Sequence, residues 1–144
     1  MLFGVSIGDC IALLEVVVKS CRAFKEGAGA SSEYQRLTTD IEHLMGLLKE
    51  LKAIPLSSHN QTQRKELDTL IQTVHETLSG FEKRTRKYDC TLGVNAKRHH
   101  VATYCRKLQW AVIQESEVAK FREVLNEQTA ILQIHLNVIE MYVD

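Results

Sequence analysis

The feature that most constrains this chain is a long amphipathic stretch near its C-terminus, residues 108–142. Apolar residues recur there at intervals of three and four, which is the period of one face of an α-helix. A helix this long with one apolar side is not stable alone in water, so the rest of the chain must supply helices that cover it. The main stripe consists of Val118, Phe121, Leu125, Leu132, Leu136 and Ile139, widened by Val124, Ile131, Ile134 and Val138.

The composition is that of one globular domain. The 144 residues are 44% hydrophobic and 25% charged, which is enough apolar material for one buried core. A single proline and seven glycines argue against a loop-rich or all-β architecture. We therefore expect residues 1–144 to form one all-α domain, an up-and-down bundle of four to five helices. Because the chain ends directly after a long apolar helix, we expect the domain to be the N-terminal part of a longer protein.

The first helix is expected to begin near Ile7, because Ser6 and Asp9 have the spacing of a capping box. Gly27 is expected just past its C-terminal end. This segment is apolar around most of its circumference, which predicts a central, buried helix. The alternative is a segment that leaves the bundle and enters a bilayer, although its apolar runs are too short for a transmembrane span.

The second helix is expected to run from an N-cap at Ser32 to Ala53, before Pro55. It carries a heptad-like seam that favours a nearly parallel or antiparallel partner: Tyr34, Leu37, Ile41, Leu44, Leu48 and Leu51. The expected order after it is a loop at 56–63, a helix at 64–88, a loop at 89–95, a helix at 96–114 and, after a break at 115–116, a final helix ending at Met141.

The cysteines and histidines show no pattern of a metal or redox site. Cys10 and Cys21 are eleven residues apart in one helix, about 16 Å along its axis, which is too far for a disulfide. No secretory signal precedes them, so we expect free thiols in a reducing cytosol and a cytoplasmic protein, with all four cysteines buried as small apolar residues: Cys10, Cys21, Cys90 and Cys105. The six histidines are expected at the surface or rim: His43, His59, His75, His99, His100 and His135.

No motif for catalysis is present in the sequence. It lacks a phosphate-binding loop, a dinucleotide fingerprint, a nucleophile elbow and the paired spacings of zinc or di-iron ligands. An enzyme needs at least a nucleophile, a base or a metal set. We therefore expect a non-enzymatic protein that uses no cofactor and no metal.

Charge is unevenly distributed although the net charge is zero. Residues 82–107 carry eight basic side chains against two acidic ones, a net charge of +6, whereas residues 111–144 carry two against six, a net charge of −4. One interpretation is a solvated basic end balanced by the neighbouring acidic helix. The other is a contact patch for anionic lipid headgroups or an acidic protein, with no role in nucleic-acid binding: Lys83, Arg84, Arg86, Lys87, Lys97 and Arg98.

Four short segments resemble one known family. They are Phe3–Asp9, Ser31–Gln35, Lys107–Ala111 and Val118–Arg122, and the resemblance extends over nearly the whole chain. The chain is similar to the fungal N-terminal helical domain that precedes NACHT-type STAND (NOD-like) modules or ubiquitin-like domains. That family is related to the HeLo-like domains.

The resemblance implies a signalling and interaction domain that couples to other domains or assembles with itself. It also implies an alternative, a membrane-active cell-death effector that associates with the membrane when activated. In the HeLo branch the first helix is the membrane-active element, which here corresponds to Ile7–Phe24. The residues of that helix expected to meet a membrane or a partner are Ile7, Ile11, Leu14 and Val18, whereas Asp9 and Glu15 depart from an apolar membrane element.

Overall fold

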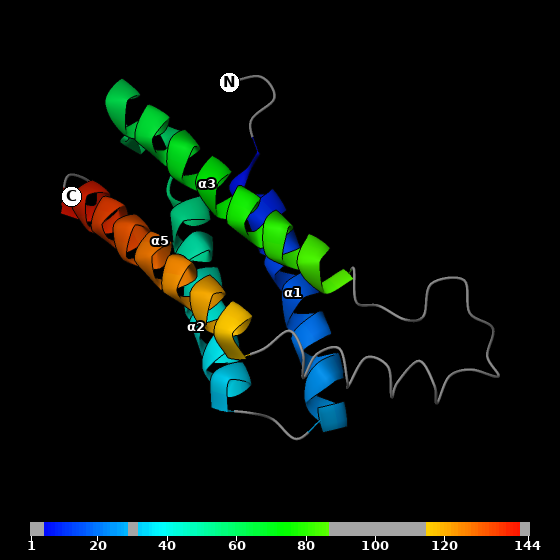
Figure 1. Ribbon diagram of the computed structural model, residues 1–144. Helices are drawn as coiled ribbons and strands as arrows, with labels where there is room; N and C mark the ends of the chain where they lie inside the picture. The colour runs from blue at the N-terminus through cyan, green and yellow to red at the C-terminus, as the bar shows by residue number, and fades with distance from the viewer. Residues whose placement is uncertain (1–4, 29–31, 87–114, 142–144) are drawn as a thin grey trace.

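The computed structural model describes residues 5–28, 32–86 and 115–141, and within these ranges it contains helices and no strand. The all-α class predicted from the sequence is therefore confirmed. The fourth expected helix, 96–114, lies outside the described residues. The elements are α1 Ile7–Ala28, α2 Ser32–Ala53, the short 3-10 helix η1 Leu56–Ser58, α3 Gln61–Arg86 and α5 Glu115–Met141 (Figure 1).

The four α-helices form a bundle in which α1 and α5 each pack against both α2 and α3 (Figure 1). Figure 1 shows that α1 and α3 run in one direction and that α2 and α5 run in the opposite one. Cys10 of α1 reaches Ile71 of α3, and Asp40 of α2 reaches Arg122 of α5. Successive helices thus alternate in direction, as in an up-and-down bundle. The connection through η1 carries the chain from α2 to α3, which lies diagonally opposite.

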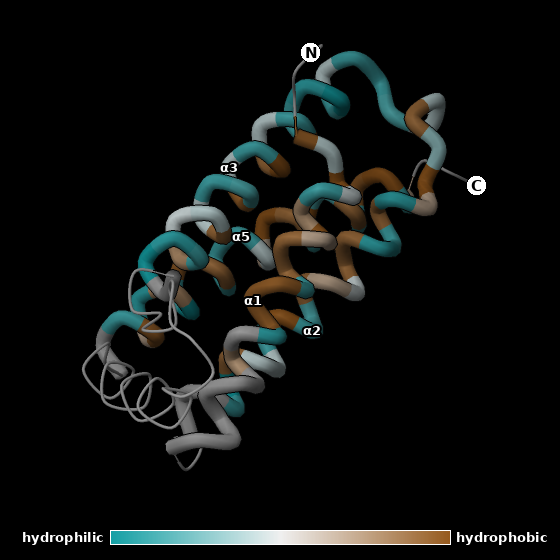
Figure 2. Tube along the Cα trace, turned by 90° about the vertical axis from the view of Figure 1, so that its right-hand side faces the viewer, coloured by the Kyte–Doolittle hydropathy of each residue, from teal (hydrophilic) through white to brown (hydrophobic). Residues whose placement is uncertain are grey.

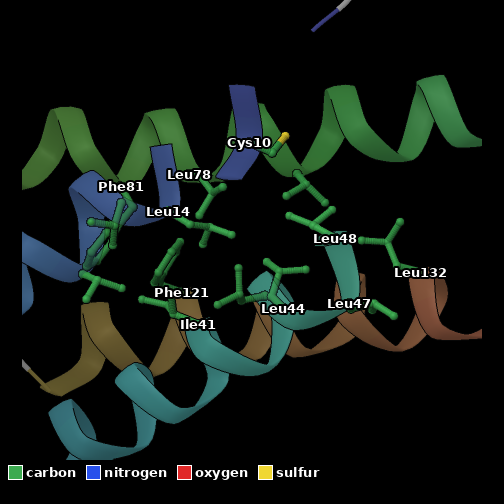
Figure 3. Close-up of a cluster of buried hydrophobic side chains, with 14 of the residues drawn as sticks. Cys10, Leu14, Ile41, Leu44, Leu47, Leu48, Leu78, Phe81, Phe121 and Leu132 are labelled. Carbon is green, nitrogen blue, oxygen red and sulfur yellow. The ribbon is translucent and has the colours of Figure 1, made fainter. Parts of the chain in front are cut away.

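The core fills the space between all four helices. The stripe predicted on α5 is buried, and so is the seam of α2 from Leu37 onward. Figure 3 shows Leu14 of α1 and Leu78 of α3 directed toward Ile41 and Leu44 of α2. At one end of this core the rings of Phe81 and Phe121 stack with centroids 3.9 Å apart. Figure 2 shows the hydrophobic stretches of α1 and α2 turned toward the middle of the bundle.

The capping box expected at the start of α1 is present. The Asp9 backbone N–H donates to Ser6 Oγ at 3.0 Å, and the Ser6 backbone N–H donates to Asp9 Oδ2 at 2.9 Å. The bonds from the Ser6 backbone and hydroxyl favour the charged carboxylate and hold the pKa of Asp9 below its usual value. The expectation at the other end was wrong, because α1 continues through Gly27 to Ala28.

The loop expected at residues 56–63 is shorter than predicted. Asn60 forms a second capping box, in which its Oδ1 accepts from the Gln63 N–H at 2.8 Å and its own N–H donates to Gln63 Oε1 at 2.9 Å. This reciprocal cap starts α3 at Gln61 instead of Arg64. Arg64 then donates two hydrogen bonds to the Leu56 carbonyl, which fixes η1 against the first turn of α3.

Candidate functional site

The outer side of α5 carries a second apolar stripe that α1, α2 and α3, the other described helices, leave exposed. Its members are 39% to 74% exposed, although they lie on the same helix as the fully buried Leu132. The sequence placed most of these residues in a single widened stripe facing the core, and that expectation was wrong. We call this set the outer stripe: Val124, Ile131, Ile134, Val138 and Met141.

The outer stripe borders a groove between α3 and α5. The groove has a volume of about 500 Å³, and its lining is mostly apolar. Ile131, Ile134 and Val138 form the α5 wall, and Lys65 and Leu70 belong to the α3 wall. Both walls belong to helices that pack directly on each other (Figure 1), so the groove is shaped by rigid elements. An elongated apolar surface of this kind suits an amphipathic helix better than a small polar substrate.

Two histidines lie under this groove. The ring of His135 on α5 stacks on that of His59, which follows η1, with centroids 5.5 Å apart and an interplanar angle of 23°. Only 4% of His59 and 7% of His135 is exposed. The expectation that all histidines lie at the surface or rim was therefore wrong for these two. Both side chains fill space between the α2–α3 connection and the C-terminal half of α5.

The ring of His135 is held in its neutral form by its surroundings. Both ring nitrogens of His59 and Nε2 of His135 are buried without a hydrogen-bond partner. Burial, and then the neighbouring His59, lower the pKa of His135, while Glu66 opposes this shift. His135 Nδ1 lies 3.9 Å from Glu66 Oε2, a distance too long for a hydrogen bond.

The pair also separates two hollows of the surface. His135 lines the groove between α3 and α5, whereas His59 lines a second hollow of about 420 Å³ formed by the start of α1, the end of α2 and α3. Within the described ranges, no group of three or more His, Cys, Asp or Glu side chains is placed to hold a metal ion.

The residues expected to meet a membrane or partner from the first helix lie largely inside the bundle. Leu14 is fully buried and Val18 nearly so, while Ile7 and Ile11 are half-buried and pack against the core. No helix among the described residues has both the length and the apolar content needed to cross a bilayer.

The structure describes only part of the expected basic patch. Lys83 and Arg84 are exposed near the end of α3, and Arg86 is the last residue of that helix. Lys87, Lys97 and Arg98 lie outside the described residues. Arg84 Nε lies 3.7 Å from Glu117 Oε2 at the start of α5, and both side chains are about half exposed, so this ion pair is weak. The acidic start of α5 thus faces the basic end of α3.

Cys10 and Cys21 are buried free thiols, as expected, and burial raises the pKa of each to about 12. Cys10 Sγ lies 3.5 Å from the Ile71 carbonyl, which is the one polar contact it makes across the bundle in the described part of the chain. Cys90 and Cys105 lie outside that part. These two buried thiols serve packing, since the reactive thiolate is suppressed.

The sequence contained a signal for the outer stripe. Val124, Ile131 and Val138 are spaced by seven residues, and Ile134 and Met141 follow Ile131 and Val138 by three, so these residues form a heptad pattern of their own that Glu127 interrupts at one position. That pattern lies beside the buried one and is not continuous with it. Packing of α5 against the other described helices uses the buried stripe and leaves the outer stripe exposed.

A comparison of this chain with protein-family models, curated proteins and solved structures finds no match.

Proposed function

We propose that this chain is a non-enzymatic interaction and signalling domain that docks a helical protein surface in the groove between α3 and α5. The observation that carries the proposal is the outer stripe, which leaves five large apolar side chains exposed along α5. Isolated exposed apolar residues are ordinary, but a contiguous row beside a groove is typical of a binding surface. This role agrees with the resemblance to the N-terminal domains of fungal NOD-like (STAND) proteins, which we retain as part of the proposal.

The burial of α1 favours this function over direct action on membranes. Leu14 and Val18 are core residues, so their exposure to lipid would require α1 to leave α2 and α3. Removing a fully buried leucine from a core costs several kcal/mol, about 2–5 for the side chain alone. The outer stripe, in contrast, is available without any rearrangement.

Site-specific photo-crosslinking in cells that produce the protein tests the proposal. A photoreactive phenylalanine analogue is placed at Ile134 in the groove or, as a matched control, at Val16, an exposed apolar position on α1. We expect discrete crosslinked protein adducts from position 134 and none of the same mass from position 16. The same adducts from both positions, or none from position 134, would contradict a docking function of the groove.

A further inference from the structure

We propose that the occupant of the groove is a second copy of this chain, whose α5 lies antiparallel to α5 of the first. This inference rests on the proposed function, since it names the partner of the same surface. The outer stripe runs from Val124 to Met141, a length of about 26 Å at 1.5 Å per residue. Seating the second helix also covers the wall of α3 that lines the groove.

The heptad pattern of the outer stripe is the first argument. Val124, Ile131 and Val138 occupy equivalent positions seven residues apart and all are β-branched. Ile134 and Met141 occupy the second apolar position of the same repeat. A repeat of this type packs knobs into holes against another helix with the same repeat, and α5 of a second copy meets that requirement without any other partner.

The central part of the outer stripe has no charge that would oppose this packing. Residues 128–139 contain no Asp, Glu, Lys or Arg, and the side chains next to the stripe there include Ala130 and Asn137. Solvent-facing helices normally carry charged residues on their outer side, as α3 does with Lys65, Asp68 and Glu76. The absence of charge over three turns of an exposed helix is the composition of an interface core.

The positions of the flanking charges fix the direction. A parallel pair would place Glu127 of one copy against Glu127 of the other, at an apolar position of the repeat, where like charges repel. An antiparallel two-fold pair instead brings Ile131 against Ile134 of the second copy and Val124 against its Met141. Glu127 of the second copy then lies level with Val138.

Lys65 completes the charge complementarity. It lines the groove on α3 together with Val138 on α5, so the antiparallel register places Glu127 of the second copy beside its ammonium group. By symmetry, Glu127 of the first copy meets Lys65 of the second copy. The two ion pairs flank the uncharged centre, which is the usual arrangement of a polar rim around an apolar interface.

Sedimentation velocity of the purified chain over a range from about 1 µM to about 1 mM tests self-association. We expect a concentration-dependent dimer. Ile134→Glu should weaken it by about 100-fold or more, because the change removes a buried apolar contact and places a carboxylate in the interface. Val16→Glu, at an exposed apolar position outside the groove, should leave it unchanged. A wild-type chain that remains monomeric throughout would overturn the proposal.

A charge exchange tests the register. Lys65→Glu and Glu127→Lys should each weaken the dimer by about two- to fivefold, in the range of exposed ion pairs, and the double variant should recover most of the loss. Neither residue lies in the core, so circular dichroism should report an unchanged fold. If the dimer affinity of the double variant falls by the product of the two single-variant losses, the two residues are not coupled and the proposed Lys65–Glu127 contact is wrong.

Disulfide trapping separates the two helix directions. In a background with Cys90→Ala and Cys105→Ala, Ile131→Cys and Ile134→Cys chains are oxidised alone and as a mixture. The antiparallel pair predicts disulfide dimers in the mixture and few with either variant alone, because residue 131 faces residue 134 of the second copy. Efficient dimers from Ile134→Cys alone would indicate a parallel pair and overturn this geometry.

The crosslinking at position 134 distinguishes this inference from the proposed function. Adducts of twice the chain mass support a second copy as the occupant. Adducts with other proteins, together with a monomeric purified chain, would overturn self-pairing and leave the docking function standing. A crosslink within one chain to residues 87–114 would overturn both, since the groove would then be covered by the chain itself.

Discussion

The outer sides of α2 and α5 differ in a way that the packing of the bundle does not require. Each helix buries one complete apolar seam, from Leu37 to Leu51 on α2 and from Val118 to Ile139 on α5. The outside of α2 is polar, with exposed residues such as Glu42 and Lys49. The outside of α5 is apolar along the outer stripe. One seam per helix is enough to form this core, so the second seam of α5 is the feature that points to function.

The largest expected effect contrasts the two seams of α5 directly. Leu132→Ala should lower the free energy of unfolding by about 2–5 kcal/mol, because Leu132 is completely buried and its truncation leaves a cavity. Ile134→Ala, two residues away and 63% exposed, should change it by less than about 1 kcal/mol. Urea denaturation at a concentration at which the chain is monomeric measures both. Equal losses would show that the outer stripe is part of the core.

A smaller effect is expected where the polar edge of α2 meets α5. Asp40 Oδ2 accepts from Arg122 Nε at 2.7 Å and from Asn126 Nδ2 at 3.1 Å, and the charged pair is mostly shielded from solvent. Asp40→Ala should lower the free energy of unfolding by about 1–2 kcal/mol, because both donors lose a partly buried acceptor. Glu42→Ala, an exposed change on the same helix, is the matched control and should have almost no effect. Equal free energies of unfolding for Asp40→Ala and Glu42→Ala would show that the contacts of Asp40 with α5 do not stabilise the fold.

The start of α3 forms the wall of the groove opposite the outer stripe, and its cap can be removed selectively. Asn60→Ala should lower the free energy of unfolding by about 1 kcal/mol, since the Gln63 backbone N–H loses its acceptor, Asn60 Oδ1, while the backbone N–H of residue 60 can still donate to Gln63. Hydrogen exchange should increase most in the first turn of α3. Gln61→Ala lies beside the cap without removing it and should leave exchange there unchanged. If the first turn of α3 keeps its protection from hydrogen exchange in the Asn60→Ala variant, packing alone holds this wall of the groove in place.

The smallest effect is a pH dependence from His135 beneath the groove. Because the pKa of His135 is lowered below its usual 6.5 in the folded chain, the unfolded chain binds more protons as the pH falls. The stability that the neutral ring contributes is complete above pH 6.5 and is lost as the pH falls through the lower folded pKa. His59 and Glu66 are the titratable groups facing this ring.

Thermal unfolding from about pH 7.5 to about pH 5 measures this dependence. The wild-type midpoint should fall over this range, and the midpoint of a His135→Phe variant should fall less, because Phe takes up no proton. His43→Phe, on the exposed side of α2, is the control and should keep the wild-type slope. Parallel slopes for wild type and His135→Phe would contradict a neutral buried ring.

Most of the fold could be predicted because it depends on local patterns. The period of the apolar residues predicts the helices, and Ser6 with Asp9 predicts the start of α1 correctly. The start of α3 was missed although Asn60 and Gln63 have capping-box spacing. The surrounding polar residues favoured a loop and hid that signal.

The candidate site was less predictable because it depends on which apolar residues remain uncovered. Ile131 and Leu132 are neighbours of similar hydrophobicity, and only the positions of α2 and α3 decide that Leu132 is buried while Ile131 is exposed. The burial of His59 has a similar cause. It is produced by a contact with His135, 76 positions further along the chain, that no local pattern encodes. Long-range packing thus determined the features on which the functional proposal rests.

The two thiols in the core have a practical consequence for studying this protein. With the pKa of Cys10 and Cys21 near 12, almost no thiolate is present at neutral pH, and both sulfur atoms are shut off from reagents while α1 stays in place. Alkylation of either residue therefore requires α1 to detach from the bundle. The labelling rate of each thiol, followed by mass spectrometry, thus reports how often that helix opens.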